Sequence, residues 1–289
     1  MRTLITGAAG QIGLALRATA PPGVEVVAVG REELDVTSAE SVTRMVRDIR
    51  PALVLNAAGY TAVDKAESEP AVAAAVNGDG PRHLASALDE YGGRLIHLST
   101  DYVFDGAASR PYLPNDSPDP INVYGVTKLA GERAVLDILD DRAIVVRTSW
   151  VYAPWGHNFL RTMVRLLNDR GQVTVVSDQT GAPTSATSVA RAAWAIAGRP
   201  RLAGVTHWTD GGSTTWFEFA LAIQQEAVGL DLVSGSCRIL PVTTDQYGAS
   251  ARRPRYSVLD CSAAQAALGV ARTHWRTELR EALVELARG

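Results

Sequence analysis

The stretch RTLITGAAGQIGLALRAT at residues 2–19 decides the fold, because it joins an apolar run to a helical pattern through three glycines. Arg2–Thr6 shows no polar alternation, which predicts a strand buried on both faces. Gly7, Gly10 and Gly13 follow directly. Glycines at such a junction allow a tight turn and let phosphates approach the unpaired N–H groups of a helix N-terminus. The stretch therefore predicts a dinucleotide-binding strand–helix unit, with an ordinary tight turn as the alternative.

The same alternation of strand and helix continues through the first half of the chain. It indicates right-handed crossovers and a Rossmann-type, doubly wound parallel sheet in an α/β protein. The second predicted helix has a candidate capping box formed by Thr37 and Glu40. We expect strands at Arg2–Thr6, Val24–Val29, Leu53–Asn56, Arg94–Ser99 and Ala143–Thr148, and helices at Gln11–Thr19, Ser38–Ile49, Gly80–Tyr91 and Tyr124–Leu139.

The second half is less regular and predicts a smaller α/β substrate-binding region. We assign residues 1–150 to dinucleotide binding and residues 151–289 mainly to substrate binding, with some later segments returning to the first domain. The proline-rich stretch 107–120 predicts an ordered surface loop that could act as a lid. We expect helices at Asn158–Arg170, Thr187–Gly198, Trp216–Val228 and Trp275–Arg288, and strands at Val173–Val176 and Val205–Trp208.

Composition narrows the classes of function. The chain has 28 basic and 31 acidic residues and a net charge of −3, so we expect no nucleic-acid partner. Two cysteines, Cys237 and Cys261, are too few for a disulfide framework or a cysteine metal site and fit a reducing compartment. No apolar run is long enough for a signal peptide or a membrane span. We therefore expect a cytoplasmic protein without membrane contact.

The ends of the second and third predicted strands indicate how a cofactor is bound. An acidic residue after the second strand would bind the ribose of NAD, whereas an arginine accommodates the 2′-phosphate of NADP. Arg31 stands there, so NADPH is favoured, with NADH as the alternative because two glutamates follow. Asp35 and Val36 could flank the adenine, with ordinary polarity at a helix entry as the alternative. Ala58 and Gly59 after the third strand leave room for a ligand or allow close helix packing.

A tyrosine and a lysine carry the predicted chemistry. In YGVTK, Tyr124 and Lys128 are four residues apart and fall on one face of a helix. A nearby ammonium favours the phenolate, so we expect Lys128 to lower the pKa of Tyr124 from about 10. Tyr124 could then protonate an incipient alkoxide, while the hydroxyl of Thr100 at the end of the fourth strand orients the carbonyl. The chain order of glycine loop, Thr100 and YxxxK favours a ketone reductase over a surface side-chain pair.

Longer motifs along the chain are more specific than the glycines. They are NAAGYTAVDKAESEP at 56–70, LSTDYVFDG at 98–106, YGVTKLAGE at 124–132, RTSWVY at 147–152, DQTGAPT at 178–184 and ARRPRYSVLD at 251–260. These motifs closely resemble the dTDP-4-dehydrorhamnose reductase family of the extended short-chain dehydrogenase/reductase superfamily, and the resemblance extends from Gly7 to residue 260. It implies that NADPH or NADH reduces the C4 ketone of dTDP-4-dehydro-6-deoxy-L-mannose, a dTDP-linked 4-keto-6-deoxy sugar, to dTDP-L-rhamnose.

The resemblance also implies roles for individual residues. Tyr124 would donate the proton, Lys128 would bind the nicotinamide ribose, and Thr100 would polarise the substrate oxygen. Trp150 would border the sugar, with core packing as the alternative. The other sugar-lining residues would be Val63, Asp101 and Tyr102. The full set of expected cofactor-binding residues, which includes the glycines and Arg31 named above, is Gly7, Gly10, Gln11, Ile12, Gly13, Arg31, Asp35, Val36, Ala58, Gly59, Thr61, Tyr124 and Lys128.

The nucleotide part of such a substrate needs cationic partners. Arginine suits bidentate contact with phosphate, and the densest basic cluster is Arg252, Arg253 and Arg255. Asn158 and Phe159 open a predicted helix and are candidates for contact with the pyrophosphate and the base. A solvated loop beside a packed Phe159 is the alternative.

One position departs from the family. Some members carry a glutamate two residues past the third glycine that holds magnesium at a dimer interface, whereas this chain has Ala15. We therefore expect no metal and a monomer or weak homodimer.

Two other functions stay open from the sequence. A reductase of another dTDP-keto-sugar, as in dTDP-dihydrostreptose formation, would differ in contacts around Val63, Tyr102 and Trp150. A non-catalytic, NADP-binding regulatory subunit, such as the similar β subunit of methionine adenosyltransferase, is disfavoured because the tyrosine, lysine and threonine are all present.

Overall fold

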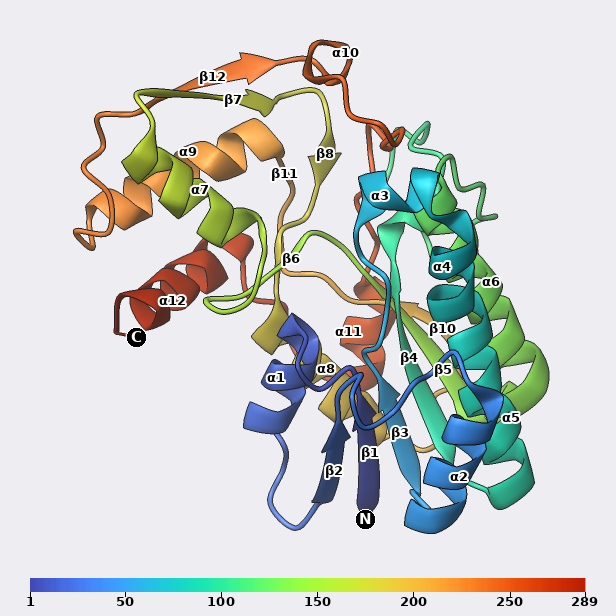
Figure 1. Cartoon of the computed structure of the whole chain (residues 1–289). Coiled ribbons are helices and arrows are strands. Elements are labelled where there is room, and N and C mark those ends of the chain that lie inside the picture. Colours follow the sequence, from blue (N-terminus) through green and yellow to red (C-terminus); the bar gives the residue numbers. More distant parts are fainter. Residues whose placement is uncertain (289) are drawn as a thin grey trace.

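The glycine-rich stretch connects the first strand and the first helix of a six-stranded parallel sheet. The computed structural model describes residues 1–288, and the sheet has the strand order β10-β5-β4-β3-β1-β2 (Figure 1). The chain changes its direction of travel across the sheet between β1 and β3, and ligands of open α/β sheets bind at such a switch point. The strands are β1 (Arg2–Thr6), β2 (Glu25–Val29), β3 (Leu53–Asn56), β4 (Arg94–Thr100), β5 (Ala143–Thr148) and β10 (Gly204–His207).

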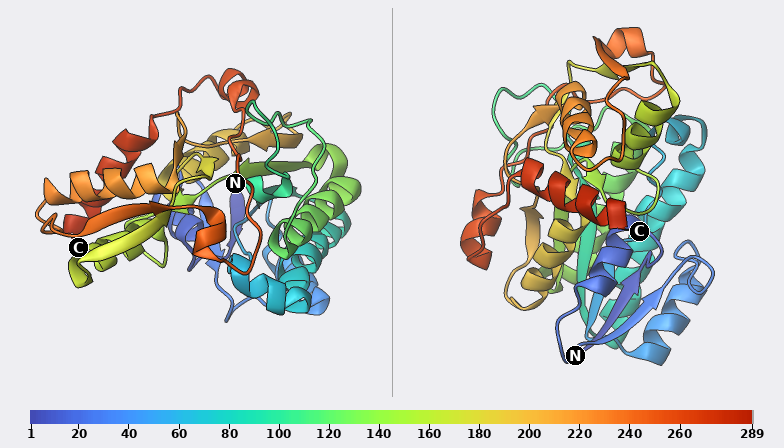
Figure 2. Two further views of the ribbon diagram at one scale, coloured as in Figure 1. Left: turned by 90° about the horizontal axis from the view of Figure 1, so that it is seen from above. Right: turned by 90° about the vertical axis from the view of Figure 1, so that its left-hand side faces the viewer.

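Helices cover both faces of this sheet, which confirms the expected Rossmann-type, doubly wound architecture (Figure 2, right). Successive strand residues point to opposite faces. Ile5 therefore packs in one cluster with Trp194, and Leu4 in another with Leu84 and Val135. The first face carries α1 (Gln11–Ala18), α8 (Ala186–Ala197) and α11 (Ser262–Leu268), and the second carries α2 (Ala39–Ile49), α5 (Gly80–Tyr91) and α6 (Val123–Leu139).

Every helix and strand expected from the sequence is present, with ends that differ by at most one residue. The capping box expected at the start of α2 is wrong. Ser38 caps α2 instead, because its hydroxyl accepts a hydrogen bond from the Ser41 N–H at 3.2 Å. Thr37 is unavailable as a cap, since its hydroxyl donates to the Asp35 carboxylate at 2.7 Å. This local turn moves the cap one residue along the chain.

The connection from β3 to β4 contains more helix than the sequence predicts. Two short helices precede α5 and are joined to it by a π-helical turn, a feature that often occurs at functional sites. Helices of five or six residues are too short for their apolar periodicity to be distinctive. These elements are α3 (Val63–Ser68), α4 (Pro70–Ala74) and the π-helix η1 (Ala75–Asp79).

The remaining elements form a second cluster beyond the carboxyl ends of the strands, at the upper left of Figure 1. Its core includes the fully buried side chains of Tyr152, Leu160, Phe219 and Leu279. β7 pairs with β12, β6 with β9, and β8 with β11. The elements are β6 (Val151–Tyr152), α7 (Phe159–Asp169), β7 (Gln172–Val176), β8 (Thr180–Gly181), β9 (Thr184–Ser185), β11 (Thr214–Thr215), α9 (Trp216–Val228), β12 (Arg238–Val242), α10 (Thr244–Tyr247) and α12 (Trp275–Arg288).

The proline-rich stretch 107–120 is an ordered loop tied to the C-terminal part of the chain. Tyr112 is buried, stacks on Phe104 with ring centroids 4.1 Å apart, and donates its N–H to the Val258 carbonyl at 2.8 Å. Arg110 and Asp116 form an ion pair within the loop. These contacts hold the centre of the loop, so its action as a lid stays a prediction.

Two further properties concern the whole described chain. No helix within residues 1–288 combines the length and apolar character needed to cross a membrane. Cys237 and Cys261 are both buried as free thiols.

Candidate active site

The glycine loop has the close contacts that its sequence predicts. Gly7 has φ +67°, and a Cβ on it would lie 2.6 Å from the backbone of Ala57. A Cβ on Gly13 would lie 2.2 Å from the Gly7 carbonyl oxygen, so α1 packs on the loop only because residue 13 lacks a side chain. Gly10 begins α1 without any side-chain cap, which leaves N–H groups at the helix N-terminus for a ligand.

Gln11 links this loop to the second cluster. Its side-chain oxygen accepts a hydrogen bond from the Asn158 amide at 2.9 Å, and its carbonyl accepts one from the Trp155 indole at 3.1 Å. Asn158 also caps α7 by accepting from the Arg161 N–H. The side-chain polar atoms of Asn158 all have hydrogen-bond partners within the protein. This geometry does not favour the predicted contact between Asn158 and substrate, which stays untested. Ile12 lies beside Gln11, half-buried in the first turn of α1.

Several exposed charged residues follow β2. Arg31, Glu32 and Glu33 are all exposed, and the Glu33 carboxylate turns back to accept the Gly30 N–H at 2.8 Å. Hydrogen bonds from Thr37 lower the pKa of Asp35. Val36 is buried against Gly80.

Asn77 positions the loop after β3 and is a site residue that the sequence did not indicate. Its side-chain oxygen accepts the Tyr60 N–H at 2.8 Å, and its amide donates to the Tyr60 carbonyl and to the Thr127 hydroxyl. Asn77 lies in the π-helix η1 and is fully buried. These hydrogen bonds hold the loop that contains Ala58, Gly59 and Thr61 close to Thr127, which lies within the YxxxK motif. The motif VNGDG carries no pattern that separates this asparagine from an ordinary helix residue.

The structure brings Thr100, Tyr124 and Lys128 to one edge of the sheet. Thr100 ends β4, and the other two lie in the first turns of α6. A Cβ on Gly125 would lie 2.1 Å from the Tyr102 carbonyl, so this glycine lets α6 press against the strand end. The rings of Tyr102 and Tyr124 meet edge to face, with centroids 5.8 Å apart.

The expected lowering of the Tyr124 pKa is wrong for the protein alone. Burial raises the pKa of Tyr124 to about 12, a hydrogen bond from Thr100 opposes this shift, and the Asp101 charge adds to it. The Lys128 ammonium is instead held by the Leu98 carbonyl at 2.6 Å. Burial lowers the pKa of Lys128 to about 8, although the Glu132 charge opposes that change. Burial is therefore the main cause of the raised Tyr124 pKa, and Lys128 is not among its causes.

Asp101 is a buried carboxylate between Thr100 and Tyr102. One of its oxygens accepts the Thr100 hydroxyl at 3.1 Å, and within the described chain the other has no hydrogen-bond partner. Burial raises the pKa of Asp101 to about 7, although the nearby Ser257 and Thr100 hydroxyls act in the opposite direction.

Asp64 binds the arginine-rich segment to α3. Both of its oxygens bind the Arg253 guanidinium, at 2.7 and 3.0 Å, and one accepts the Ala251 N–H at 3.0 Å. The Arg253 hydrogen bond is the main reason that the pKa of Asp64 is lowered. Arg253 also lies near Tyr102, one of the expected sugar-lining residues. Val63, the first residue of α3, directly precedes Asp64.

Trp150 is half-buried directly after β5 and stacks on Trp216. Ala15 is fully buried in the core between the sheet and α8, at the position where some family members hold a metal. No group of three His, Cys, Asp or Glu residues able to hold a metal lies within residues 1–288. The absence of a metal stays a prediction.

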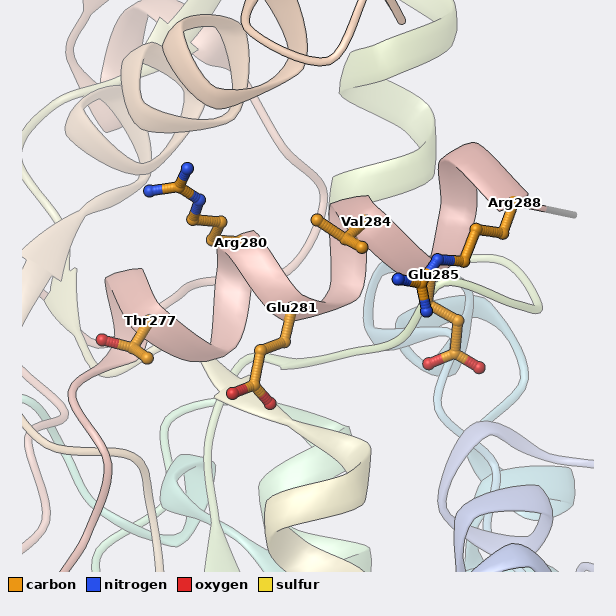
Figure 3. Close-up of a pocket in the computed structure, with 6 residues that line it drawn as sticks. All are labelled: Thr277, Arg280, Glu281, Val284, Glu285 and Arg288. Carbon is orange, nitrogen blue, oxygen red and sulfur yellow. The ribbon is translucent and has the colours of Figure 1, made fainter.

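A surface hollow lies away from these residues. It has a volume of about 610 Å³ and follows one face of α12 (Figure 3). Its walls are mostly charged, and none of the site residues described above lines it. The lining residues are Thr277, Arg280, Glu281, Val284, Glu285 and Arg288.

Comparison with known proteins extends this description. The family described as RmlD substrate binding domain matches residues 1–288. The dTDP-4-dehydrorhamnose reductase of Streptomyces griseus is 45% identical and covers 99% of this chain and 94% of its own. The dTDP-4-keto-6-deoxy-D-glucose reductase of Streptomyces niveus is 42% identical and covers 97% of this chain and 96% of its own.

A solved structure shows the same arrangement over the whole length. The dTDP-4-dehydrorhamnose reductase of Bacillus anthracis strain Ames, in complex with NADP, has a TM-score of 0.92 to this chain and 35% sequence identity. The alignment covers 98% of this chain and 99% of that one. The chain therefore belongs to the dTDP-4-dehydrorhamnose reductase family.

Proposed function

We propose that this protein reduces the C4 ketone of dTDP-4-dehydro-6-deoxy-L-mannose to dTDP-L-rhamnose, with NADPH as the hydride donor. The observation that carries the proposal is that Thr100, at the carboxyl end of β4, lies with Tyr124 and Lys128 of α6 at the sheet edge where the glycine loop follows β1. Membership in the reductase family supports the choice of substrate.

The residues around the glycine loop fit a phosphorylated dinucleotide. Gly7 and Gly13 admit no Cβ, and the uncapped N-terminus of α1 faces the loop. Arg31 is exposed where a 2′-phosphate would lie, which favours NADPH over NADH. NADPH supplies the hydride when bound, and the protein supplies position and a proton.

Tyr124 is the proton donor in this proposal. Because its pKa is raised to about 12, the phenol is protonated at neutral pH. An alkoxide formed at C4 is a stronger base than a phenolate and takes the proton from the Tyr124 Oη. Thr100, at the end of β4 near Tyr124, orients the ketone oxygen toward the phenol. Lys128 uses one of its three N–H donors on the Leu98 carbonyl and has others for the nicotinamide ribose.

The sugar and nucleotide lie on the side of the second cluster. Val63, Asp101, Tyr102 and Trp150 would line the sugar, and Arg253 would bind the pyrophosphate from its place beside Asp64 and Tyr102. Residues 1–150 would mainly hold the cofactor and residues 151–289 the substrate. β10 and α8 belong to the later range but pack in the cofactor half.

Turnover with the keto-sugar tests the proposal. NADPH consumption with dTDP-4-dehydro-6-deoxy-L-mannose, followed by identification of the product, is expected to give dTDP-L-rhamnose. A second candidate is a reductase of another dTDP-keto-sugar, since the Streptomyces niveus relative is a dTDP-4-keto-6-deoxy-D-glucose reductase. Faster turnover of that sugar would favour the second candidate. Absence of turnover with both sugars would favour a non-catalytic role.

A further inference from the structure

The backbone of Trp150 is held in an uncommon conformation. Its φ is +46°, in the left-handed region that bulky side chains rarely adopt. Such conformations persist only where the surrounding structure imposes them, and they cluster at ligand sites. The contacts that hold the Trp150 indole therefore bear on the site that it borders.

Trp216 covers one face of this indole. The two ring centroids are 3.7 Å apart and the ring planes differ by only 9°, so the rings are stacked. Trp216 is the first residue of α9, whose start is fixed by a capping box between Thr215 and Glu218. Phe159 packs against Trp216 from α7, with centroids 4.7 Å apart. The Trp216 ring is thus fixed by two helices of the second cluster.

Gly181 covers the opposite face. A Cβ on Gly181 would lie 2.5 Å from Trp150 Cε2 and 2.7 Å from both Cζ2 and Nε1. Cε2 is set back between the other two atoms, so an approach along the ring edge would make it the farthest of the three. Gly181 therefore meets the face of the Trp150 ring. The three nearest atoms all belong to Trp150 and none to Trp216, so Gly181 lies on the face that Trp216 does not cover. Pairing with Thr214, two residues before Trp216, keeps Gly181 there.

We infer that Trp216 and Gly181 are positioning residues for the nucleotide-sugar substrate, because they clamp the Trp150 indole and leave only its edge to contact the sugar. This inference rests on the proposed function, which places Trp150 beside the sugar. With both faces covered, Trp150 does not stack on the thymine or on the sugar ring. The orientation of its edge then contributes to substrate selection.

Product binding tests the clamp. Trp216→Leu removes the ring, and we expect affinity for dTDP-L-rhamnose, measured by calorimetry with NADP bound, to fall roughly ten-fold. NADP affinity is expected to be unchanged. Trp216→Phe retains an aromatic ring and is expected to restore most of the product affinity. Gly181→Ala is expected to weaken product binding with Trp216 intact. Leu221→Ala, an exposed change on the same helix, is the matched control.

Circular dichroism separates this inference from the proposed function. Stacked indoles couple their electronic transitions, so the unchanged protein is expected to show an exciton couplet that Trp216→Leu and Trp150→Phe abolish and Leu221→Ala retains. Unchanged product affinity in Trp216→Leu despite loss of the couplet would overturn the inference. A couplet without any product binding would instead refute the proposed function and the substrate named here.

Discussion

At the scale of single residues, turnover is proposed to depend on one proton held by Tyr124. Tyr124→Phe retains the ring that meets Tyr102 edge to face and removes only the acidic hydroxyl. We expect kcat to fall by about 10²–10⁴-fold, the usual contribution of a general acid, with NADPH affinity unchanged. Steady-state kinetics and a fluorescence titration with NADPH measure the two effects. A variant with near-normal kcat would show that another group donates the proton.

Arg31 gives a second prediction at this scale. Its guanidinium is exposed after β2, while the neighbouring Glu33 is bound to the Gly30 N–H. Hydrogen bonds to charged groups contribute about 1.5–3 kcal/mol, so Arg31→Ala is expected to raise the KM for NADPH by roughly ten-fold or more. The KM for NADH, which lacks the 2′-phosphate, is expected to change little. Equal increases for both cofactors would contradict the assignment.

At the scale of elements, the Asp64–Arg253 pair joins α3 to the segment that precedes the C-terminal helices. Asp64→Asn keeps an acceptor for the Ala251 N–H but loses the bidentate ion pair. Because Asp64 is about half exposed, the loss of stability is expected to stay below about 1 kcal/mol. The substrate KM is expected to rise several-fold while the NADPH KM stays constant. Arg110→Gln, which breaks an ion pair in the surface loop, is the control.

The difference between what the sequence predicts and what it does not is clearest among these elements. Apolar periodicity predicts each long helix and buried strand, because burial on one or both faces leaves a direct mark on residue order. The hydrogen-bond partners of Asp64 and Gln11 lie 189 and 147 positions away. The order of neighbouring residues contains no signal for such distant pairs. The i, i+4 spacing likewise places Tyr124 and Lys128 on one face of a helix but does not indicate how deeply the two side chains are buried. The shift in the Tyr124 pKa therefore could not be predicted.

At the scale of the whole molecule, Asp210 makes stability depend on pH. It follows β10, and its carboxylate accepts the Ser185 N–H at the start of α8. Burial raises its pKa from 3.8 to about 7, with the Ser188 hydrogen bond opposing the shift. Because the pKa of Asp210 is higher in the folded than in the unfolded state, its contribution to the free energy of unfolding is complete below pH 3.8. That contribution is lost as pH rises toward 7, at up to roughly 1.4 kcal/mol per pH unit.

Asp210→Asn removes this titration and retains an oxygen for the Ser185 N–H. We expect the variant to unfold at a higher urea concentration than the unchanged protein at pH 8 and at a similar concentration at pH 4. Comparing the two proteins at each pH cancels the contribution of the other carboxylates to the pH dependence of stability. The exception is Glu278, whose charge interacts with Asp210. Equal midpoints at pH 8 would contradict the assignment.

Ala15 leads to a prediction about cofactors and assembly. Because its buried methyl group occupies the position of a metal-binding glutamate in some relatives, EDTA is expected to leave NADPH oxidation unchanged. Light scattering is expected to show a monomer or a weak dimer. Activity that is lost in EDTA and restored by magnesium would overturn this expectation.

The hydrogen bond between Gln11 and Asn158 has a thermodynamic consequence. Gln11 belongs to the loop that would carry the coenzyme phosphates, and Asn158 starts the helix that supports Trp216 through Phe159. Coenzyme that steadies this loop also steadies the wall of the sugar site. Linkage between two ligands is reciprocal, so the factor by which coenzyme tightens sugar binding equals the factor by which sugar tightens coenzyme binding. Gln11→Ala removes the bond to Asn158 but keeps the backbone bond to Trp155, so it would reduce both factors together.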